Sequence, residues 1–356
     1  MRFHILGLAH TKTNHDYTAC AYTQKVLKFG KMMTQLGHEV YHYGHKESDL
    51  VCTEHIPVID NDIYNLNYGD HDFHSKFFKF DAHKDVSYIV FNEVACREID
   101  KRKQPGDFLL AFWGAGHRTI CDVHKDMIVV EPGIGYASGH FAPYKVFESY
   151  ALYHAVLGAD AAETCGKMSW TDTVIPNYFD NDDFTYSDEK EDYILFLGRV
   201  YNGKGIDKAI KATQIAGKKL VVCGQNDENL SFPNHVEFRG HVGREERREV
   251  LSKAKALFIG SQYVEPFGGV QVEALLSGTP TITSDIGAFT ENNVQGMTGY
   301  RCRLFSHYVD AIVNIDKISP QICRSFGEQF LLDPVGRKYE KYFKEILQIE
   351  SQPYKL

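Results

Sequence analysis

The feature that most constrains the fold is an alternation of short apolar runs and helical stretches, which breaks near residue 180 and then starts again. In the first half, apolar runs predict strands at residues 3–8, 39–43, 88–91, 108–112 and 127–130. Apolar residues at helical spacing predict helices at residues 22–36 and 144–157. Residues 52–84 are irregular and rich in His, Asp, Asn and Phe, and no element is assigned to them.

The second half repeats the pattern after a charged stretch at residues 187–192. Strands are predicted at residues 193–197, 219–223, 236–239, 256–259 and 279–283. Helices are predicted at residues 206–215, 244–252, 268–276 and 335–349. Strands that alternate with helices favour a parallel, doubly wound sheet in each half.

The length of the chain fits two such domains, because 356 residues exceed what one ordinary core accommodates. The sequence therefore predicts an α/β protein with two Rossmann-like domains, at residues 1–180 and 181–334, whose parallel sheets face an interdomain cleft. The C-terminal stretch, residues 335–356, is expected to form a helix that packs back on the first domain. Ligands of doubly wound sheets bind beyond the carboxyl ends of the strands, so we expect the chemistry in that cleft.

Net charge and cysteine usage disfavour several classes of protein. The formal net charge of -8 argues against sequence-independent binding to nucleic acid, which depends on a basic surface. The eight cysteines have no paired spacing, which is typical of reduced thiols and disfavours a zinc site. No apolar stretch approaches the roughly 20 residues of a membrane span, and no signal-peptide pattern is visible. We expect a soluble, cytoplasmic protein.

The most informative stretch is Glu-Pro-Phe-Gly-Gly-Val-Gln-Val-Glu-Ala at residues 265–274, which follows a predicted strand and runs into a helix. Its glycines let a ligand approach the backbone closely, and the start of the helix offers free N–H groups to an anion. Glu265 precedes this helix, and Glu273 lies within it. Two carboxylates beside an anion site are suited to binding the hydroxyl groups of a sugar and of a ribose. The alternative is an ordinary helix cap with two surface glutamates.

A second stretch, Leu-Gly-Arg-Val-Tyr-Asn-Gly-Lys-Gly at residues 197–205, supplies positive charge. A predicted strand ends at Gly198 and delivers Arg199 and Lys204 into the loop before a helix. Two cations on a glycine-bearing loop suit a diphosphate, and they can stabilise the charge that develops as a nucleoside diphosphate leaves. An ordinary basic turn is the alternative.

Together and in this order, the two stretches resemble the retaining glycosyltransferases of family 4, which have the GT-B fold. Further segments that resemble the family are Val-Ile-Pro-Asn-Tyr-Phe-Asp at residues 174–180, Val-Glu-Phe-Arg-Gly-His-Val at 236–242, Leu-Ser-Gly-Thr-Pro at 276–280, Gly-Ala-Phe-Thr-Glu at 287–291 and Gly-Met-Thr-Gly at 296–299. Tyr178 stands where the family usually has glycine. The resemblance is specific over about residues 170–300 and weak in the N-terminal half.

The resemblance implies a role for each matching residue. Arg199 and Lys204 would bind the donor diphosphate, Glu265 would hold hydroxyls of the transferred sugar, and Glu273 would bind the ribose. The other donor-site residues implied are Gly198, Gly240, His241, Val242, Phe267, Gly268, Gly269 and Val270. The resemblance implies a UDP- or GDP-sugar as co-substrate, and neither a metal nor a cofactor. It also implies that the departing phosphate oxygen helps to take the acceptor proton.

The N-terminal half departs from the family pattern. Many relatives carry a glycine-rich loop after the first strand, and the residues at that place or in a similar loop here are His10, Thr11, Thr13 and His117. After the predicted strand at residues 127–130, relatives often place His or Asp near the reacting centre, where this chain has Glu131 and, shortly after it, Gly133. Glu131 is therefore a catalytic candidate that would orient the acceptor or assist proton transfer. The alternative is a carboxylate that caps a loop.

Three Asp-x-Asp triplets begin at Asp60, Asp70 and Asp180. A different glycosyltransferase fold uses such a triplet to hold a metal and a diphosphate. Asp and Asn are also favoured in turns, so turns are the expected structure and no metal site is expected.

The expected function is retaining transfer of a sugar from a UDP- or GDP-sugar to a hydroxyl acceptor, which could be a glycan, a lipid, a small molecule or a modified DNA base. Nucleic acid stays open as a partner but is disfavoured by the net charge. Enzymatic alternatives with the same fold are a nucleotide-sugar 2-epimerase and a phosphorylase. An alternative of another class is a non-catalytic module that binds a glycan or nucleic acid, against which the two cations and two glutamates argue.

Overall fold

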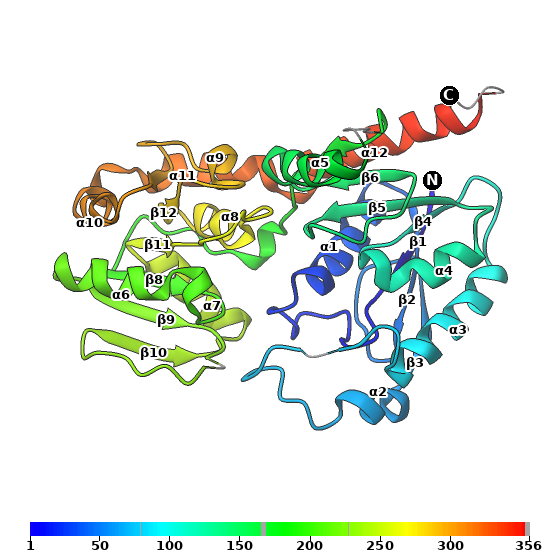
Figure 1. The fold of residues 1–356 in the computed structure, drawn as a ribbon, viewed down its shortest axis with the longest axis horizontal. Coiled ribbons are helices and arrows are strands. Elements are labelled where there is room, and N and C mark those ends of the chain that lie inside the picture. Colours follow the sequence, from blue (N-terminus) through cyan, green and yellow to red (C-terminus); the bar gives the residue numbers. More distant parts are fainter. Residues whose placement is uncertain (79, 165–168, 227, 353–356) are drawn as a thin grey trace.

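The structure, a computed structural model, describes residues 1–78, 80–164, 169–226 and 228–352. Two domains lie side by side, each built on a parallel sheet with helices packed against it (Figure 1). The predicted α/β architecture with two parallel, Rossmann-like sheets is therefore confirmed.

Within the described residues, the first domain contains a seven-stranded sheet in the order β3-β2-β1-β4-β5-β6-β7. Its strands are β1 Arg2–Leu6, β2 Glu39–His45, β3 Glu54–Ile59, β4 Phe108–Leu110, β5 Ile128–Ile134, β6 Tyr144–Phe147 and β7 Thr173–Val174. Its helices are α1 Ala21–Gln35, α2 Asn61–Tyr68, α3 Val86–Asp100, α4 Arg118–Val123 and α5 Tyr150–Thr164, with a 3-10 turn, η1, at Gly114–His117. All neighbouring strands run parallel.

The second domain, over its described residues, contains a six-stranded parallel sheet in the order β10-β9-β8-β11-β12-β13. Its strands are β8 Tyr193–Leu197, β9 Lys219–Cys223, β10 Val236–Gly240, β11 Ala256–Ile259, β12 Thr281–Ser284 and β13 Gly299–Cys302. The helices of this domain are α6 Ile206–Ile215, α7 Arg244–Lys253, α8 Gly269–Leu276, α9 Phe289–Asn292, α10 Phe305–Asn314 and α11 Pro320–Gly327, and the last helix of the chain is α12 Leu332–Glu350. The 3-10 turns are η2 Asn181–Asp183, η3 Asn202–Lys204, η4 Ile315–Lys317 and η5 Glu328–Phe330.

Two sequence-based predictions in the first half are wrong. Residues 88–91, predicted as a strand, lie in α3, where Ser87, Tyr88, Phe91, Ala95 and Ile99 form one buried face at helical spacing. A four-residue apolar run does not by itself distinguish a buried strand from one face of a helix. Here the spacing of the buried residues over 87–99 is that of a helix.

Residues 144–157, predicted as one helix, are divided between β6 and α5. Tyr144 pairs with Val130 of β5, and Val146 pairs with Thr173 of β7, so long-range ladder hydrogen bonds override the local helical pattern. The unassigned residues 52–84 contain β3 and α2. Asp60 is the N-cap of α2, because its carboxylate accepts hydrogen bonds from the backbone N–H groups of Asp62 and Ile63.

The last helix, α12, belongs to the core of the first domain although it follows the second domain in sequence (Figure 1). Phe343 lies 4.7 Å from Phe3 between ring centroids, and Tyr339 meets Phe29 edge-on at 5.8 Å. The chain passes between the domains twice, near Phe179 and near Leu332. These two segments are hydrogen-bonded to each other, because the N–H of Leu332 donates to the carbonyl of Phe179 at 3.0 Å. Residues 353–356, the end of the helix predicted at 335–356, lie outside the described residues.

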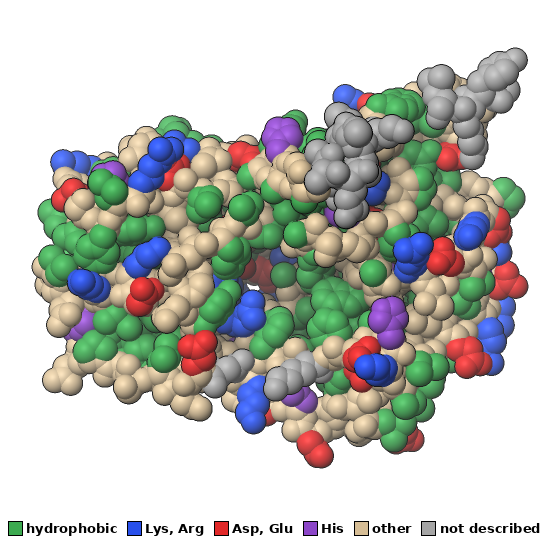
Figure 2. Space-filling model, viewed as in Figure 1, with side chains coloured by type: hydrophobic (Ala, Val, Ile, Leu, Met, Phe, Trp, Pro, Cys, Tyr) green, Lys and Arg blue, Asp and Glu red, His purple; other side chains and the backbone are tan. Residues whose placement is uncertain are grey.

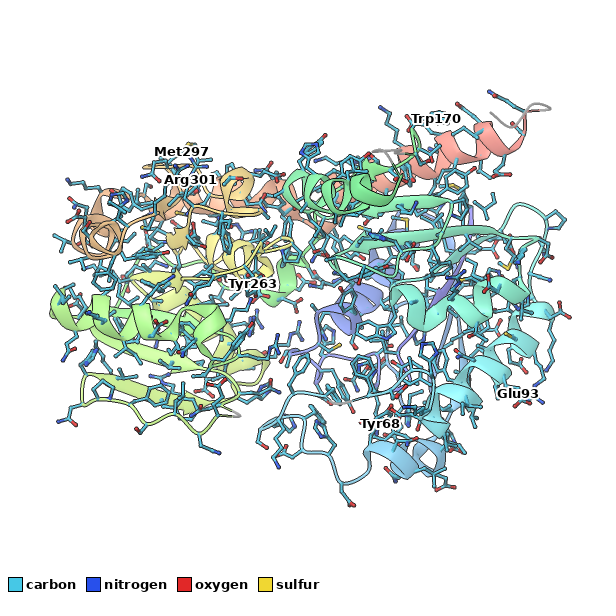
Figure 3. All side chains as sticks on the ribbon, viewed as in Figure 1. Tyr68, Glu93, Trp170, Tyr263, Met297 and Arg301 are labelled. Carbon is cyan, nitrogen blue, oxygen red and sulfur yellow. The ribbon has the colours of Figure 1, made fainter. Side chains whose placement is uncertain are left out.

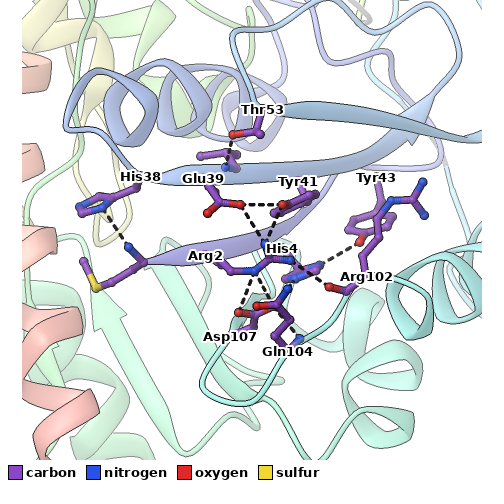
Figure 4. A network of polar contacts seen from close by, with 12 residues as sticks. Arg2, His4, His38, Glu39, Tyr41, Tyr43, Thr53, Arg102, Gln104 and Asp107 are labelled. Carbon is purple, nitrogen blue, oxygen red and sulfur yellow. Dashed lines mark hydrogen bonds and ion pairs between the residues drawn. The ribbon is translucent and has the colours of Figure 1, made fainter.

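A polar network joins the amino end of β1 to its neighbours in the sheet (Figure 4). The Asp107 carboxylate accepts hydrogen bonds from Arg2 Nε at 3.2 Å and from the backbone N–H of Gln104 at 2.9 Å. It also lies 2.9 Å from Nε2 of His4, whose Nδ1 faces the hydroxyl of Tyr43 at 2.8 Å. Burial lowers the pKa of His4, so the imidazole is neutral near pH 7.

We expect Asp107→Asn to lower the free energy of unfolding by about 1.5–3 kcal/mol, the range for hydrogen bonds to a charged group. The amide has one acceptor atom for these donors, and its NH₂ group would face another donor. Urea unfolding measures the effect. Asp122→Asn, on the exposed side of α4, is the control and should change stability by less than about 0.5 kcal/mol. Equal stability of Asp107→Asn and the wild type would contradict the prediction.

Candidate functional site

A cleft of about 760 Å³ lies between the two domains and is lined by residues of both. Figure 2 shows the molecule hollowed between its two halves. The carboxyl ends of β8, β9 and β11 in the second domain border this cleft through Leu197, Gly224 and Ile259. This is the place where doubly wound sheets bind their ligands.

The basic loop after β8 lines the cleft with Gly198, Arg199 and Lys204. Gly205 closes the loop at φ +79°, and a Cβ there would lie 2.4 Å from the carbonyl oxygen of Gly260, so only glycine fits. The close approach holds the loop against the end of β11. The guanidinium of Arg199 lies over the ring of Phe77 at 4.2 Å, and Nζ of Lys204 lies 3.0 Å from Oε2 of Glu265.

Glu265 lies between the end of β11 and the start of α8 and is buried in the cleft wall. Its Oε2 also accepts a hydrogen bond from the hydroxyl of Ser261 at 2.7 Å. Tyr263 extends the same wall, at the edge of the second domain that faces the first (Figure 3). Nζ of Lys204 lies 4.9 Å from the centre of the Tyr263 ring. A cation and a carboxylate therefore face the same part of the cleft.

The start of α8 borders the cleft with Phe267, Gly268, Gly269 and Val270. Gly268 has φ +78°, and a Cβ there would lie 2.4 Å from the Phe289 ring. A glycine at this place lets the chain turn directly from the Glu265 loop into the helix. The helix start carries partial positive charge and N–H groups without intrahelical acceptors, which suits an anion.

Glu273 lines the cleft from within α8 and is held by an arginine that the sequence analysis did not place in the site. Nε of Arg247 donates to Oε2 of Glu273 at 2.8 Å. Lys28 of α1 reaches the same region from the first domain, with Nζ 4.7 Å from the centre of the Phe179 ring. Burial lowers the pKa of Lys28, while the charge of Glu273 opposes this change.

A segment of the first domain that follows α2, residues 69–78, reaches across to the second domain (Figure 1). Nε2 of Gln225 donates to the carbonyl oxygens of Phe73 at 2.7 Å and of Lys76 at 3.2 Å. The ring of His74 lies 5.0 Å from that of His241. His241 and Val242 line the cleft. Gly240, the last residue of β10, has φ +72° and does not line it. Through His241, the loop predicted to border the nucleotide base thus contacts this segment.

The candidates of the N-terminal half are mostly outside the cleft. His10 lines it, with Nδ1 2.6 Å from the hydroxyl of Tyr88, and burial lowers the pKa of His10 to about 3. Oγ1 of Thr11 pairs with Oγ1 of Thr23 at 2.6 Å, and the N–H of Thr13 donates to Ser48 at 3.0 Å. Both threonines thus stabilise the buried loop after β1.

His117, Glu131 and Gly133 are also internal. Nε2 of His117 lies 2.9 Å from the carbonyl oxygen of Gly7, and burial lowers its pKa to about 4. The Glu131 carboxylate accepts hydrogen bonds from the Tyr136 hydroxyl and from the N–H groups of Phe141 and Ala142, each at 2.8 Å. Glu131 is fully buried and does not line the cleft, so its carboxylate ties a loop to β5 rather than facing a substrate.

The cleft contains an ion pair that the sequence analysis missed. Lys25 of α1 pairs with Glu148, which follows β6, and Lys25 also donates to the carbonyl of Gly133 at 2.9 Å. A signal for Lys25 existed, because it lies among the apolar residues that mark the buried face of α1. No such signal existed for Glu148, because the strand that precedes it was interpreted as part of a helix.

Hydrogen bonds give structural roles to the Asp-x-Asp triplets that begin at Asp60 and Asp180. Asp60 caps α2, and the Asp180 carboxylate accepts from the N–H of Asp182 at the start of η2. Over the described residues, His, Cys, Asp and Glu side chains do not gather in threes in a way that would hold a metal ion. None of the helices in this part of the chain has the length and apolar character needed to cross a membrane.

The chain is similar to known proteins in part of its sequence. Residues 179–312 match the family described as Glycosyl transferases group 1. The O-antigen chain mannosyltransferase RfbU of Salmonella typhimurium is 31% identical over 175 residues, which are 46% of this chain and 49% of that protein. The chain spans less than half the length of the curated relatives it matches.

The fold is shared with solved structures over nearly the whole chain. AviGT4, a glycosyltransferase involved in avilamycin A biosynthesis, superposes with a TM-score of 0.69 over 98% of both chains, at 18% identity. HepE of Anabaena in complex with UDP-glucose superposes with a TM-score of 0.59 over 97% of this chain and 100% of that one, at 13% identity. The chain therefore has the GT-B fold, and its similarity to the glycosyl transferases group 1 lies in residues 179–312.

Proposed function

We propose that this chain is a retaining glycosyltransferase that takes its sugar from a UDP- or GDP-sugar. The observation that carries the proposal is the arrangement of two cations, Arg199 and Lys204, and two carboxylates, Glu265 and Glu273, around one cleft at the start of α8. The matching family and the UDP-glucose complex of HepE support a nucleotide-sugar donor. The hydroxyl acceptor would occupy the part of the cleft that the first domain lines.

Each group has a role in this proposal. The diphosphate would lie between Arg199, Lys204 and the first turn of α8, where guanidinium, ammonium and N–H groups all favour negative charge. Glu265 would accept hydrogen bonds from hydroxyls of the sugar, and Glu273 from those of the ribose. Lys204 and Glu265 pair with each other at 3.0 Å, so the donor would insert between two groups that already face each other.

In the reaction, the bond between the anomeric carbon and the phosphate oxygen breaks, and the acceptor oxygen bonds to that carbon on the same face. The acceptor proton passes to the departing phosphate oxygen. The negative charge that develops on the diphosphate is the charge that Arg199 and Lys204 stabilise, which is the term that usually dominates such catalysis. Closure of the two domains on the donor would exclude water from the cleft.

A panel of nucleotide sugars tests the proposal, with release of UDP or GDP measured with and without candidate acceptors. A product glycoside with the anomeric configuration of the donor supports it. Release of a free, epimerised sugar would instead identify a 2-epimerase. Absence of any binding or release with every UDP- and GDP-sugar would contradict the proposal and favour a non-catalytic binding module.

We expect Glu273→Ala to weaken nucleotide binding by roughly tenfold to hundredfold, because hydrogen bonds to a charged group contribute about 1.5–3 kcal/mol. Isothermal titration with UDP and GDP measures the dissociation constants. Glu345→Ala, an exposed glutamate on α12, is the matched control and should leave them unchanged. Unaltered affinity in Glu273→Ala would remove Glu273 from the ribose site.

A further inference from the structure

A buried ion pair stands in the wall of the cleft that the first domain contributes. The side chains of Lys25 and Glu148 are 4% and 5% exposed, and both residues line the cleft. Apart from Lys25, Oε1 of Glu148 has no hydrogen-bond partner among the described residues. Burying two charges costs more than their attraction commonly returns, so such a pair is weak evidence for a stabilising role. Charged groups held in a cleft are instead candidates for binding a substrate.

The position of Glu148 is set by contacts between the domains. The next residue, Ser149, donates from its hydroxyl to the carbonyl of Pro266 at 2.6 Å, and Pro266 directly follows Glu265. The carboxylate of Glu291 accepts from the N–H groups of Tyr150 at 3.0 Å and of Ala151 at 2.7 Å. These bonds place Glu148 beside the proposed sugar site. Burial raises the pKa of Glu148, Lys25 opposes this change, and the nearby charge of Glu265 adds to it.

The backbone of Gly135 lies close to this ion pair. A Cβ at Gly135 would lie 2.9 Å from Oε2 of Glu148 and 3.3 Å from Nζ of Lys25, so a larger residue would crowd the pair. Gly135 lines the cleft as well, so the ion pair lies against bare backbone in the cleft wall.

An aromatic wall leads away from the ion pair along the first domain. Nζ of Lys25 lies 4.3 Å from the centre of the Tyr22 ring, and Tyr22 meets Trp113 edge-on at 4.8 Å. Trp113 lies 5.1 Å from Phe80, which stacks on His10 at 4.4 Å. Tyr22, Trp113, Phe80 and His10 all line the cleft. Flat apolar rings bind to such aromatic faces by stacking.

We propose that Glu148, positioned by Lys25, accepts a hydrogen bond from the hydroxyl that receives the sugar, and that the aromatic wall stacks a ring which carries this hydroxyl. The acceptor class is thus a ring-bearing alcohol rather than a linear polyol. The inference rests on the proposed glycosyltransferase function and adds the acceptor side of the same cleft. Glu148 orients the acceptor oxygen and keeps its own charge, while the acceptor proton leaves on the departing phosphate oxygen.

The first test compares Glu148→Gln with the wild type in three measurements: nucleotide affinity, donor hydrolysis without acceptor, and transfer. We expect transfer to fall roughly tenfold to hundredfold, mainly through a higher KM for the acceptor, because an amide is a weaker acceptor than a carboxylate. Nucleotide affinity and hydrolysis should stay within about twofold. Asp172→Asn, which removes a carboxylate from a mostly buried pair with Lys145 outside the cleft, is the matched control.

The double variant Lys25→Met with Glu148→Gln covers the case in which Lys25 without its partner disturbs folding. It removes both charges with little change in volume, and the same loss of transfer is expected. If the wild type neither binds nor uses a nucleotide sugar, the proposed function fails and this inference fails with it. If it does, and Glu148→Gln transfers as fast as the wild type with an unchanged KM, only the acceptor role of Glu148 is overturned.

The second test concerns the acceptor class and does not depend on turnover. Trp170 is the other tryptophan of the chain and is exposed, so Trp170→Phe leaves Trp113 as the fluorescent reporter. We expect benzyl alcohol or a methyl glycoside to quench Trp113 fluorescence and glycerol to leave it unchanged. A response to benzyl alcohol alone identifies an aromatic acceptor, and one to the glycoside alone identifies a sugar acceptor. Quenching by glycerol as strong as by both rings, or by none of the three, overturns the ring-stacking role.

Discussion

Replacing Arg199 with alanine is expected to lower glycosyl transfer by at least ~100-fold, the scale on which loss of one charge-stabilising donor reduces turnover. Arg199 is exposed in the cleft beside the proposed diphosphate site and contacts Phe77 through its guanidinium. Without it, the charge on the departing diphosphate would be balanced by Lys204 and the start of α8 alone. Glu265→Ala is expected to lower turnover on the same scale, because it removes the carboxylate that would hold the sugar.

Steady-state release of UDP or GDP measures this effect with the best donor of the panel. Arg337→Ala, which removes an exposed arginine paired with Asp333 on α12, is the matched control and should keep wild-type turnover. Thermal unfolding of each variant separates lost chemistry from lost structure, and Arg199→Ala should unfold at the wild-type temperature. Near-normal turnover in Arg199→Ala would exclude Arg199 from the reaction.

Phe343→Ala is expected to destabilise the first domain by about 3–5 kcal/mol, the range for deleting a buried aromatic ring. The side chain is fully buried among Phe3, Phe29 and Phe108, with ring centroids 4.7, 6.2 and 5.0 Å away. The substitution lies in α12, which is remote in sequence from the other elements of the domain that it stabilises.

Urea unfolding measures the change, and hydrogen exchange locates it. Amide protection should fall in β1, β4 and α1, which share a core with α12, and less in the second domain. Lys341→Ala, whose side chain is largely exposed on the same helix, should stay within about 0.5 kcal/mol of the wild type. If Phe343→Ala weakened only the second domain, the assignment of α12 to the first core would be wrong.

Much of the second domain could be predicted because its signals are local. The strand β8, the loop with Arg199 and Lys204, and helix α6 follow one another directly in sequence, and each has its own pattern of apolar residues and glycine. The same holds for β11, the Glu265 loop and α8. Parallel strands end at one edge of a sheet, so these two loops were expected to meet there, and the structure brings both to the cleft.

The first domain was harder to interpret, because its short strands are decided by long-range pairing. Tyr144–Phe147 has a helical pattern locally and becomes β6 only because β5 and β7 lie on either side. The error hid Glu148, since a carboxylate at the end of a strand suggests a site and one inside a helix does not. Glu131 shows the opposite case. Its place in the sequence suggested a catalytic role, but its carboxylate accepts hydrogen bonds from groups within the first domain.

By itself, the sequence determined the fold class, the division into two parallel-sheet domains and the charged loops of the second one, because all of these depend on residues that are neighbours along the chain. Only the tertiary structure decided what the first domain presents to the cleft. Lys25 meets Glu148, and Gln225 binds the segment with Phe73, across separations in sequence that no local pattern records. These contacts depend on how helices and sheets pack, and packing is a property of the whole chain.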